Sequence, residues 1–206
     1  MENVSIYLSE NRINLKEENY QCFSCFKAEY IDGFFLNEFH LGAGHSFKTS
    51  IEKDFCLISI PLLGGFEFKT QFEHDFLEAG QALILAENEI LEIINPYETE
   101  TIEFIQIKIS NSNFIQKSEK IILDFSQKNQ LLKIQKNVFI GKFDGRAEGI
   151  FKAKSTETTI YVYIIAGVFE VQNRLLHTKD GLSLANCEEI EFEALSNEAV
   201  ILIVEV

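Results

Sequence analysis

Apolar and polar residues alternate along much of the chain, which is the pattern of β-strands that bury one face. In residues 188–195, Ile190, Phe192 and Ala194 alternate with acidic residues. In residues 102–109 both alternating sets contain apolar side chains, so this segment is predicted to be a strand that is largely buried on both faces. The pattern predicts an all-β protein.

Helical periodicity is sparse. The best candidate lies in residues 111–127, where Phe114, Ile121, Ile122 and Phe125 have only partly helical spacing. This stretch is predicted to be an irregular connection with at most one helical turn, and it marks a natural boundary within the chain.

The pattern of residues 58–109 recurs in shorter form in residues 161–206. Each copy has an apolar strand that ends at a glycine, a short strand, a polar loop, a second glycine and further strand-like segments. The corresponding glycines are Gly65 and Gly167, followed by Gly80 and Gly181. A duplicated run of short strands predicts two small antiparallel barrels, each with a cavity that opens at one end.

The repeat also predicts the domain organisation. An N-terminal barrel is expected over residues 1–116, a linker over residues 117–136 and a C-terminal barrel over residues 137–206. A ligand would bind in the mouth of one of these barrels.

Composition and charge narrow the classes of partner. Hydrophobic residues make up 46% of the chain and there are 19 Phe, which is enough apolar material to fill two barrel interiors. The net charge of −14 repels phosphate backbones, so direct binding of nucleic acid through a basic patch is not expected.

The beginning of the chain and its cysteines bear on its location. Residues 1–15 lack the continuous apolar core of a signal peptide. No apolar run approaches the roughly 20 residues that span a bilayer. The chain is therefore expected to be cytoplasmic, with no membrane partner and with its four cysteines as reduced thiols.

Cys22 and Cys25 form a Cys-x-x-Cys motif, a type that binds zinc or exchanges disulfides in other proteins. Zinc would need a second pair of ligands, and Cys56 and Cys187 are isolated in the sequence. The motif lies in a predicted strand, where its two side chains would point to opposite faces. It is interpreted as a coincidence of sequence.

The whole chain resembles the pirin and quercetin 2,3-dioxygenase-like bicupins. The C-terminal half carries the resemblance in NVFIGKFDG, YVYIIAGVFEV, LLHTKDGLSLAN and EAVILIVEV. The N-terminal half carries it in FSCFKAEYIDGFF, HLGAGHSFKTSIEKDFCLISIPLLGGFEF and INPYETETIEFIQIKI. The resemblance implies a double-stranded β-helix fold, with two cupin barrels in tandem.

The chain departs from this family at the metal site. Members that bind a metal have His-x-His where this chain has Ser50 and Glu52, and their later His and Glu fall within residues 90–95, here ILEIIN. There is no histidine between His74 and His177. The usual site of three histidines and one carboxylate is therefore degenerate, no cofactor is expected, and the dioxygenase activity is not carried over.

One unconventional metal site stays open as an alternative. His45 and Glu52 come from the correct region and Glu92 from a strand opposite, so these three residues could bind Fe, Ni or Cu. The histidines outside this set are interpreted as structural residues: His40 as an exposed strand residue, and His74 and His177 as residues of polar loops.

Three functions remain open. The preferred prediction is a metal-free, non-catalytic pirin-like bicupin that binds a small apolar or aromatic molecule in its first barrel, around the residues Phe47, Ser50, Glu52 and Phe66. The alternative is a divergent metal-dependent dioxygenase of the quercetinase type. The third is an interaction protein that acts on a protein partner, as pirin-like regulators do.

Overall fold

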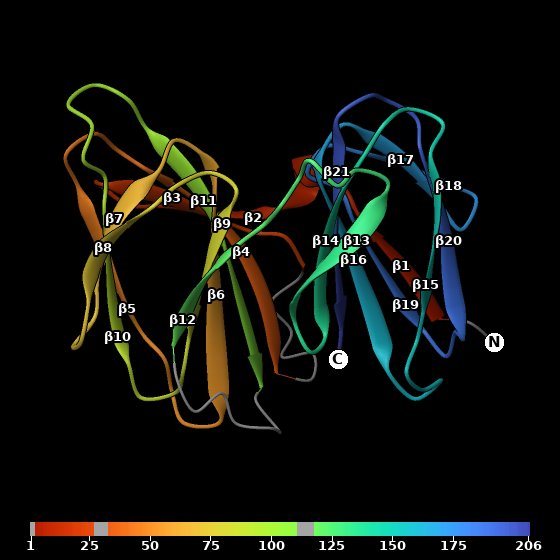
Figure 1. Cartoon of the computed structure of the whole chain (residues 1–206), viewed down its shortest axis with the longest axis horizontal. Coiled ribbons are helices and arrows are strands. Elements are labelled where there is room, and N and C mark those ends of the chain that lie inside the picture. Colours follow the sequence, from red (N-terminus) through yellow and green to blue (C-terminus); the bar gives the residue numbers. More distant parts are fainter. Residues whose placement is uncertain (1–2, 27–32, 111–117) are drawn as a thin grey trace. The chain divides into compact units, whose positions relative to one another are not determined.

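In a computed structural model, which describes residues 3–26, 33–110 and 118–206, the chain is built from antiparallel strands (Figure 1). Within these ranges the only helical element is the short 3₁₀ helix η1 (Ser9–Asn11). The all-β prediction is confirmed. A helix suited to crossing a membrane is absent from the described residues.

The chain forms two compact units. One comprises Ile13–Leu123 and the other comprises Met1–Arg12 together with Asp124–Val206. We call them the N-terminal barrel and the C-terminal barrel. The predicted boundaries placed residues 1–12 with the first barrel, whereas strand β1 (Asn3–Tyr7) pairs with β19 (Gly181–Ala185) in the second.

Residues that were predicted to form a linker also take part in the two units. Strand β12 (Glu119–Ile122) pairs with β9 (Gln81–Leu85) in the N-terminal barrel, and β13 (Gln130–Gln135) pairs with β14 (Val138–Phe143) in the C-terminal barrel. Of the predicted irregular connection 111–127, residues 111–117 lie outside the described ranges.

The N-terminal barrel consists of two sheets. A seven-stranded sheet has the order β12-β9-β6-β11-β4-β3-β2, and a four-stranded sheet has the order β5-β10-β7-β8. The strands not yet bounded are β2 (Ile13–Lys16), β3 (Tyr20–Ser24), β4 (Phe34–Leu41), β5 (Ser46–Ser50), β6 (Phe55–Leu63), β7 (Phe66–Lys69), β8 (His74–Leu77), β10 (Ile90–Ile94) and β11 (Ile102–Ser110).

The C-terminal barrel has the same construction. Its six-stranded sheet has the order β1-β19-β16-β21-β14-β13, and its four-stranded sheet has the order β15-β20-β17-β18. The strands not yet bounded are β15 (Glu148–Lys152), β16 (Thr159–Ala166), β17 (Val168–Val171), β18 (Arg174–His177), β20 (Glu189–Ala194) and β21 (Ala199–Glu205).

The two barrels repeat one topology. The order β9-β6-β11-β4 of the first large sheet corresponds to β19-β16-β21-β14 of the second, and β5-β10-β7-β8 corresponds to β15-β20-β17-β18. The duplication that was predicted from the sequence is therefore present in the strand pairing (Figure 1). In each large sheet one further strand borders the β9 or β19 edge: β12 in the first and β1 in the second.

Aromatic side chains fill both interiors. In the N-terminal barrel Phe39 stacks on Phe104, with ring centroids 5.2 Å apart and an angle of 9° between the planes. In the C-terminal barrel Phe143 meets Phe192 edge to face at 5.2 Å. Strand β11 is buried on both faces, as predicted, because the alternate residues such as Ile105 are buried as well.

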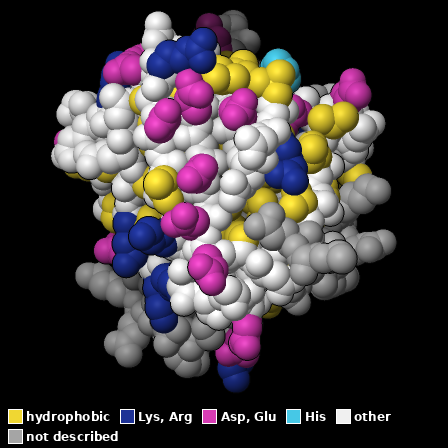
Figure 2. All heavy atoms as spheres, turned by 90° about the vertical axis from the view of Figure 1, so that its right-hand side faces the viewer, with side chains coloured by type: hydrophobic (Ala, Val, Ile, Leu, Met, Phe, Trp, Pro, Cys, Tyr) yellow, Lys and Arg dark blue, Asp and Glu magenta, His cyan; other side chains and the backbone are white. Residues whose placement is uncertain are grey.

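One exposed face of the C-terminal barrel is acidic (Figure 2). Glu148, Glu193 and Glu170 lie opposite one another on the neighbouring strands β15, β20 and β17. Together with Glu191 they border a surface hollow of about 240 Å³. Like charges directly opposite each other in a sheet are unfavourable, and this face repels anionic partners.

Asn95 holds the end of the first barrel together. It is only 1% exposed. Its side-chain Nδ2 donates to the carbonyls of Leu41 and Gly42, each at 3.0 Å, and of Glu100 at 2.8 Å. Its Oδ1 accepts a hydrogen bond of 3.0 Å from the backbone N–H of Tyr97. One buried amide thus joins the end of β4 to the loop between β10 and β11.

We expect Asn95→Ala to lower the free energy of unfolding by roughly 2 kcal/mol, because the truncation leaves buried carbonyl groups without their donor. Urea denaturation followed by circular dichroism would measure it. Asn197→Ala is the control, since Asn197 is exposed and accepts one hydrogen bond, from the N–H of Gly145. An equal decrease in the free energy of unfolding for the two variants would contradict the role assigned to Asn95.

Candidate functional site

The N-terminal barrel contains a cavity of about 210 Å³. Its walls come from β4, β5, β6 and β11, so both sheets of the barrel contribute. The lining side chains are Phe35, Asn37, Phe39, Phe47, Thr49, Leu57, Gln106 and Lys108. Strand alternation explains the set, because residues two apart on a strand point to the same face.

One end of the cavity is aromatic. Phe39 and Phe47 approach each other across the two sheets with ring centroids 4.7 Å apart. Tyr20 meets Phe47 edge to face at 5.1 Å, and Phe104 stacks behind Phe39. These rings offer both faces and edges, which are the surfaces that hold another aromatic ring.

The middle of the cavity is polar and uncharged. Asn37 and Gln106 lie opposite each other on β4 and β11, and Ser59 of β6 lies opposite Gln106 on its other side. The Nε2 of Gln106 donates to the Oγ of Ser59 at 3.3 Å. Thr49 of β5 adds a hydroxyl to the lining. This row can form hydrogen bonds with a ligand without adding charge.

The third part of the cavity is cationic. Lys108 lies across from Phe35 of β4 and Leu57 of β6, and its ammonium is 4.9 Å from the ring centre of Phe55 and 5.8 Å from that of Phe35. The ammonium forms an ion pair with Glu52, in the turn between β5 and β6. The hydrogen bond from Lys108 is the main cause that lowers the pKa of the Glu52 carboxyl below its ordinary value.

The four residues that were predicted to surround the cavity do not all lie at it. Phe47 lines the cavity, and Glu52 lies beside it through its ion pair with Lys108. Phe66 is fully buried in the core, with its ring 5.3 Å from that of Phe104. Ser50 lies on the exposed face of β5, and its neighbour Thr49 faces the cavity instead. A role for any of them in binding stays a prediction.

The donor set around this cavity does not fit the transition metal that the family resemblance implies. On β10, in the segment where the family has its later ligands, Leu91 and Ile93 are fully buried hydrocarbons of the core. Among the described residues the lining offers amide and hydroxyl groups and the ammonium of Lys108, whereas Fe, Ni and Cu need several imidazoles or carboxylates.

The alternative ligand set is also spread out. Glu92 alternates with Leu91 and Ile93 and forms an ion pair with Lys48, at 3.5 Å. His45 is exposed just before β5, and Glu52 is engaged by Lys108. In the described part of the chain, these three residues do not form one of the converging groups of potential ligands.

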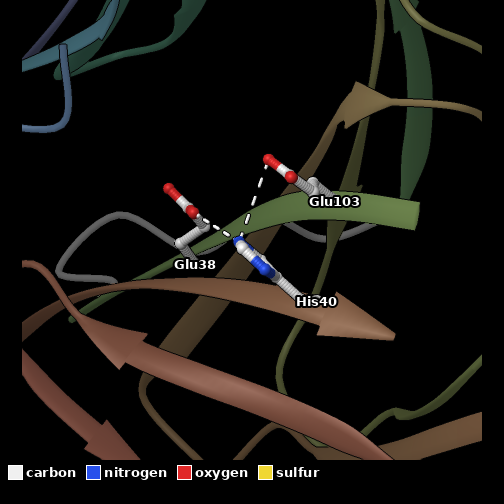
Figure 3. Close-up of side chains that lie close together, drawn as sticks. All are labelled: Glu38, His40 and Glu103. Atoms are coloured by element: carbon white, nitrogen blue, oxygen red, sulfur yellow. Dashed lines mark hydrogen bonds and ion pairs between the residues drawn. The ribbon is translucent and has the colours of Figure 1, made fainter. Parts of the chain in front are cut away.

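A different group of potential ligands does converge. Glu38, His40 and Glu103 point toward one another from β4 and β11 (Figure 3). The Nε2 of His40 is 2.7 Å from a carboxylate oxygen of Glu38 and 3.8 Å from one of Glu103. The side chain of Glu38 is only 1% exposed, whereas those of His40 and Glu103 are about a quarter exposed. We call these three residues the Glu–His–Glu cluster.

The Glu–His–Glu cluster lies on the face of the large sheet opposite the cavity, because Glu38 and His40 alternate along β4 with Asn37 and Phe39. Its three ligand atoms lie within 4.8 Å of one another and could hold a divalent cation. Without a cation, His40 and Glu38 are joined by a hydrogen bond.

Sequence reasoning interpreted His40 only as an exposed strand residue, whereas it is partly buried and bonded to Glu38. The spacing Glu-x-His on one strand places Glu38 and His40 on the same face, so two residues of the Glu–His–Glu cluster could have been predicted from the sequence.

The cysteines of the Cys-x-x-Cys motif are partly or fully buried. All four cysteines are present as thiols, and Cys25, Cys56 and Cys187 are buried. Burial raises the pKa of the Cys22 thiol to about 11, and that of Cys56 to about 11 as well. The thiolate, which is the nucleophile, is scarce at neutral pH.

Cys22 is therefore expected to react with iodoacetamide at pH 8 at least ~100-fold more slowly than free N-acetylcysteine, with the rate rising up to about pH 11. Mass spectrometry of the modified peptides would follow each thiol. Rapid alkylation of Cys22 at pH 8 would contradict its burial and reopen thiol chemistry at the motif.

Comparison with known proteins places this geometry in context. Residues 123–206 match the protein family described as the quercetinase C-terminal cupin domain. YhhW from Escherichia coli superposes with a TM-score of 0.82, at 18% identity over 98% of this chain and 97% of YhhW.

Two further structures show the same fold. Bacterial pirin YhhW in complex with nickel(II), from Escherichia coli, gives a TM-score of 0.79 at 16% identity, over 98% of each chain. Quercetin 2,3-dioxygenase from Acinetobacter baumannii gives 0.68 at 12% identity, over 98% of this chain and 85% of that one. No curated protein matches the sequence significantly. The predicted tandem arrangement of two cupin barrels is confirmed.

Proposed function

We propose that the chain is a bicupin of the pirin and quercetinase type, and that it binds small aromatic molecules in its N-terminal barrel without the help of a metal. The observation that carries this proposal is the lining of the cavity. The described residues of the lining contribute aromatic rings, two amides, a hydroxyl and an ammonium. Where the family has its later metal ligands, this chain has the buried side chains of Leu91 and Ile93.

The size of the cavity supports a ligand with one ring. An apolar cavity of about 150 Å³ is enough to bind benzene, whereas pockets for drug-sized molecules begin at roughly 300 Å³. The 210 Å³ available here hold one aromatic ring with a short substituent. The tilted pair of Phe39 and Phe47 would contact such a ring.

The chemistry of the lining favours binding over catalysis. Asn37, Gln106 and Thr49 can orient a polar substituent, and none of the described residues that line this cavity is a histidine or a carboxylate that could act as a general base. The ammonium of Lys108 is held as an ion pair by Glu52. The alternative of a dioxygenase that uses His45, Glu52 and Glu92 has weaker support, because Glu52 and Glu92 are engaged by different lysines.

The acidic face of the C-terminal barrel supports partners other than nucleic acid (Figure 2). A row of carboxylates opposes any approach of phosphate groups to this face. A protein partner is compatible with this face and would need basic side chains to contact it.

A cavity-blocking variant tests the proposed function. Thr49→Phe adds a ring to the cavity lining, and Ser50→Phe adds the same ring to the exposed face of the same strand. We expect EDTA-treated parent protein to bind the neutral probe benzyl alcohol, measured by calorimetry. Thr49→Phe should weaken this binding at least ~10-fold, and Ser50→Phe should not change it.

The outcome that contradicts the proposal is equally specific. No binding of benzyl alcohol by folded parent protein, or equal binding by parent and Thr49→Phe, would show that the cavity is not the ligand site. Thermal denaturation of both variants would confirm that they are folded.

A second candidate function is divalent-metal binding at the Glu–His–Glu cluster, favoured by its three ligand atoms within 4.8 Å of one another. Nickel titration by calorimetry separates the alternatives. Binding at the cluster is expected to be lost in His40→Gln and kept in His74→Gln, because His74 is an exposed histidine paired with the single carboxylate of Glu67 at 3.1 Å. Binding that is unaffected by His40→Gln but lost in Glu52→Gln would instead support the dioxygenase alternative.

A further inference from the structure

The lining of the N-terminal cavity changes in a fixed order along β4 and β11. The first row across these strands pairs Phe39 with Phe104, the second pairs Asn37 with Gln106, and the third pairs Phe35 with Lys108. The cavity is therefore aromatic at one end, amide-lined in the middle and cationic at the other end. Such a gradient matches a ligand that has an apolar ring at one end and an anionic group at the other.

The positive charge at the cationic end is held in place by its surroundings. The side chain of Lys108 is only 25% exposed. It lies between Phe35 and Leu57 on the neighbouring strands, with the ring of Phe55 nearby. A partly buried ammonium needs an anionic partner, because desolvation without a partner is unfavourable. The lysine is thus the fixed member of its ion pair.

Glu52 is the exchangeable member of this pair. Its side chain is 58% exposed and comes from the turn between β5 and β6. A carboxylate that is already mostly in water loses little solvation when it moves away from the lysine. Another carboxylate could therefore replace it on Lys108.

We propose that the ligand of the N-terminal cavity is a monocyclic aromatic carboxylate, and that Glu52 occupies the place of the ligand carboxylate on Lys108 until the ligand binds. This inference rests on the proposed binding function and names its ligand class. The ring lies against Phe39 and Phe47, and the carboxylate replaces that of Glu52 on the ammonium.

The dimensions of the strands select the length of the ligand. Phe104 and Lys108 are four positions apart on β11, which corresponds to roughly 13 Å along an extended strand. The lysine side chain covers part of this distance. A short chain between ring and carboxylate covers the rest and passes Asn37 and Gln106, so 3-phenylpropanoate is a suitable probe.

Calorimetry with a matched pair of probes tests this inference. Parent protein is expected to bind 3-phenylpropanoate about 10-fold more tightly than the neutral 3-phenylpropanamide. Lys108→Met should abolish this preference, and Lys108→Arg should retain it. Glu52→Gln should tighten binding of the carboxylate ~3- to 10-fold and leave binding of the amide unchanged, because it removes the competing carboxylate.

Asp75→Asn is the matched control. Asp75 forms an ion pair with Lys120 in the same barrel, outside the cavity lining. The change removes one negative charge, as Glu52→Gln does, and should not alter the affinity for either probe. If Asp75→Asn increased the affinity for 3-phenylpropanoate as much as Glu52→Gln, the increase would be due to net charge alone. That result would contradict the proposed replacement of Glu52 by the ligand carboxylate.

Two other results would also overturn the inference. They are equal affinities of parent protein for the acid and the amide, and an unchanged affinity of Glu52→Gln for the acid. Since Glu52 is exposed, its substitution tests the proposal even if Lys108→Met fails to fold. Binding of benzyl alcohol together with either result would leave the proposed function standing, whereas no binding of any aromatic probe would remove both.

Discussion

The pairing of β4 with β11 is the interaction on which the chemistry of the N-terminal barrel depends. It places Asn37 opposite Gln106 on one face of the sheet and His40 opposite Glu103 on the other. A shift of one residue in β4 would turn the buried carboxylate of Glu38 toward the aromatic cavity. Burial of an unpaired charge there would be strongly unfavourable. The register is thus specified by the rings and amides of the cavity on one face and by the hydrogen bond between His40 and Glu38 on the other.

Apolar residues occupy the positions of β10 at which the family resemblance implies metal ligands, and they help to stabilise the barrel. Leu91 and Ile93 fill the inward positions of β10 with hydrocarbon and join the aromatic core. Apolar burial therefore supplies stabilisation at these positions. The space that remains in the barrel is lined by rings and amides, and the ammonium of Lys108 is paired with Glu52 from the adjacent turn.

Most of the fold could be predicted from the sequence, because both the alternation and the duplication are local patterns. The position of β1 could not, since its pairing with β19 joins residues far apart in the chain, and many strands have similar apolar patterns. Burial of Val4 against the C-terminal core is consistent with that pairing. The position of β1 at the edge of the second large sheet thus follows from tertiary contacts rather than from local signals.

The candidate site was predictable only in part. Phe47 was predicted to lie at the cavity of the first barrel, and it is one of the residues that line it. The choice of Ser50 over Thr49 was a difference of one residue, which in a strand changes the face. The Glu52–Lys108 pair and the Glu–His–Glu cluster each join two segments, so they depend on register and turn geometry that no local pattern contains.

The most direct test of a metal-free aromatic site is a crystal structure of EDTA-treated protein with 3-(4-bromophenyl)propanoate, using the anomalous signal of bromine. The account predicts a bromine peak inside the N-terminal barrel beside Phe39 and Phe47, with the carboxylate on Lys108 and Glu52 turned away. A bromine peak elsewhere, or binding that appears only after metal is restored, would contradict it.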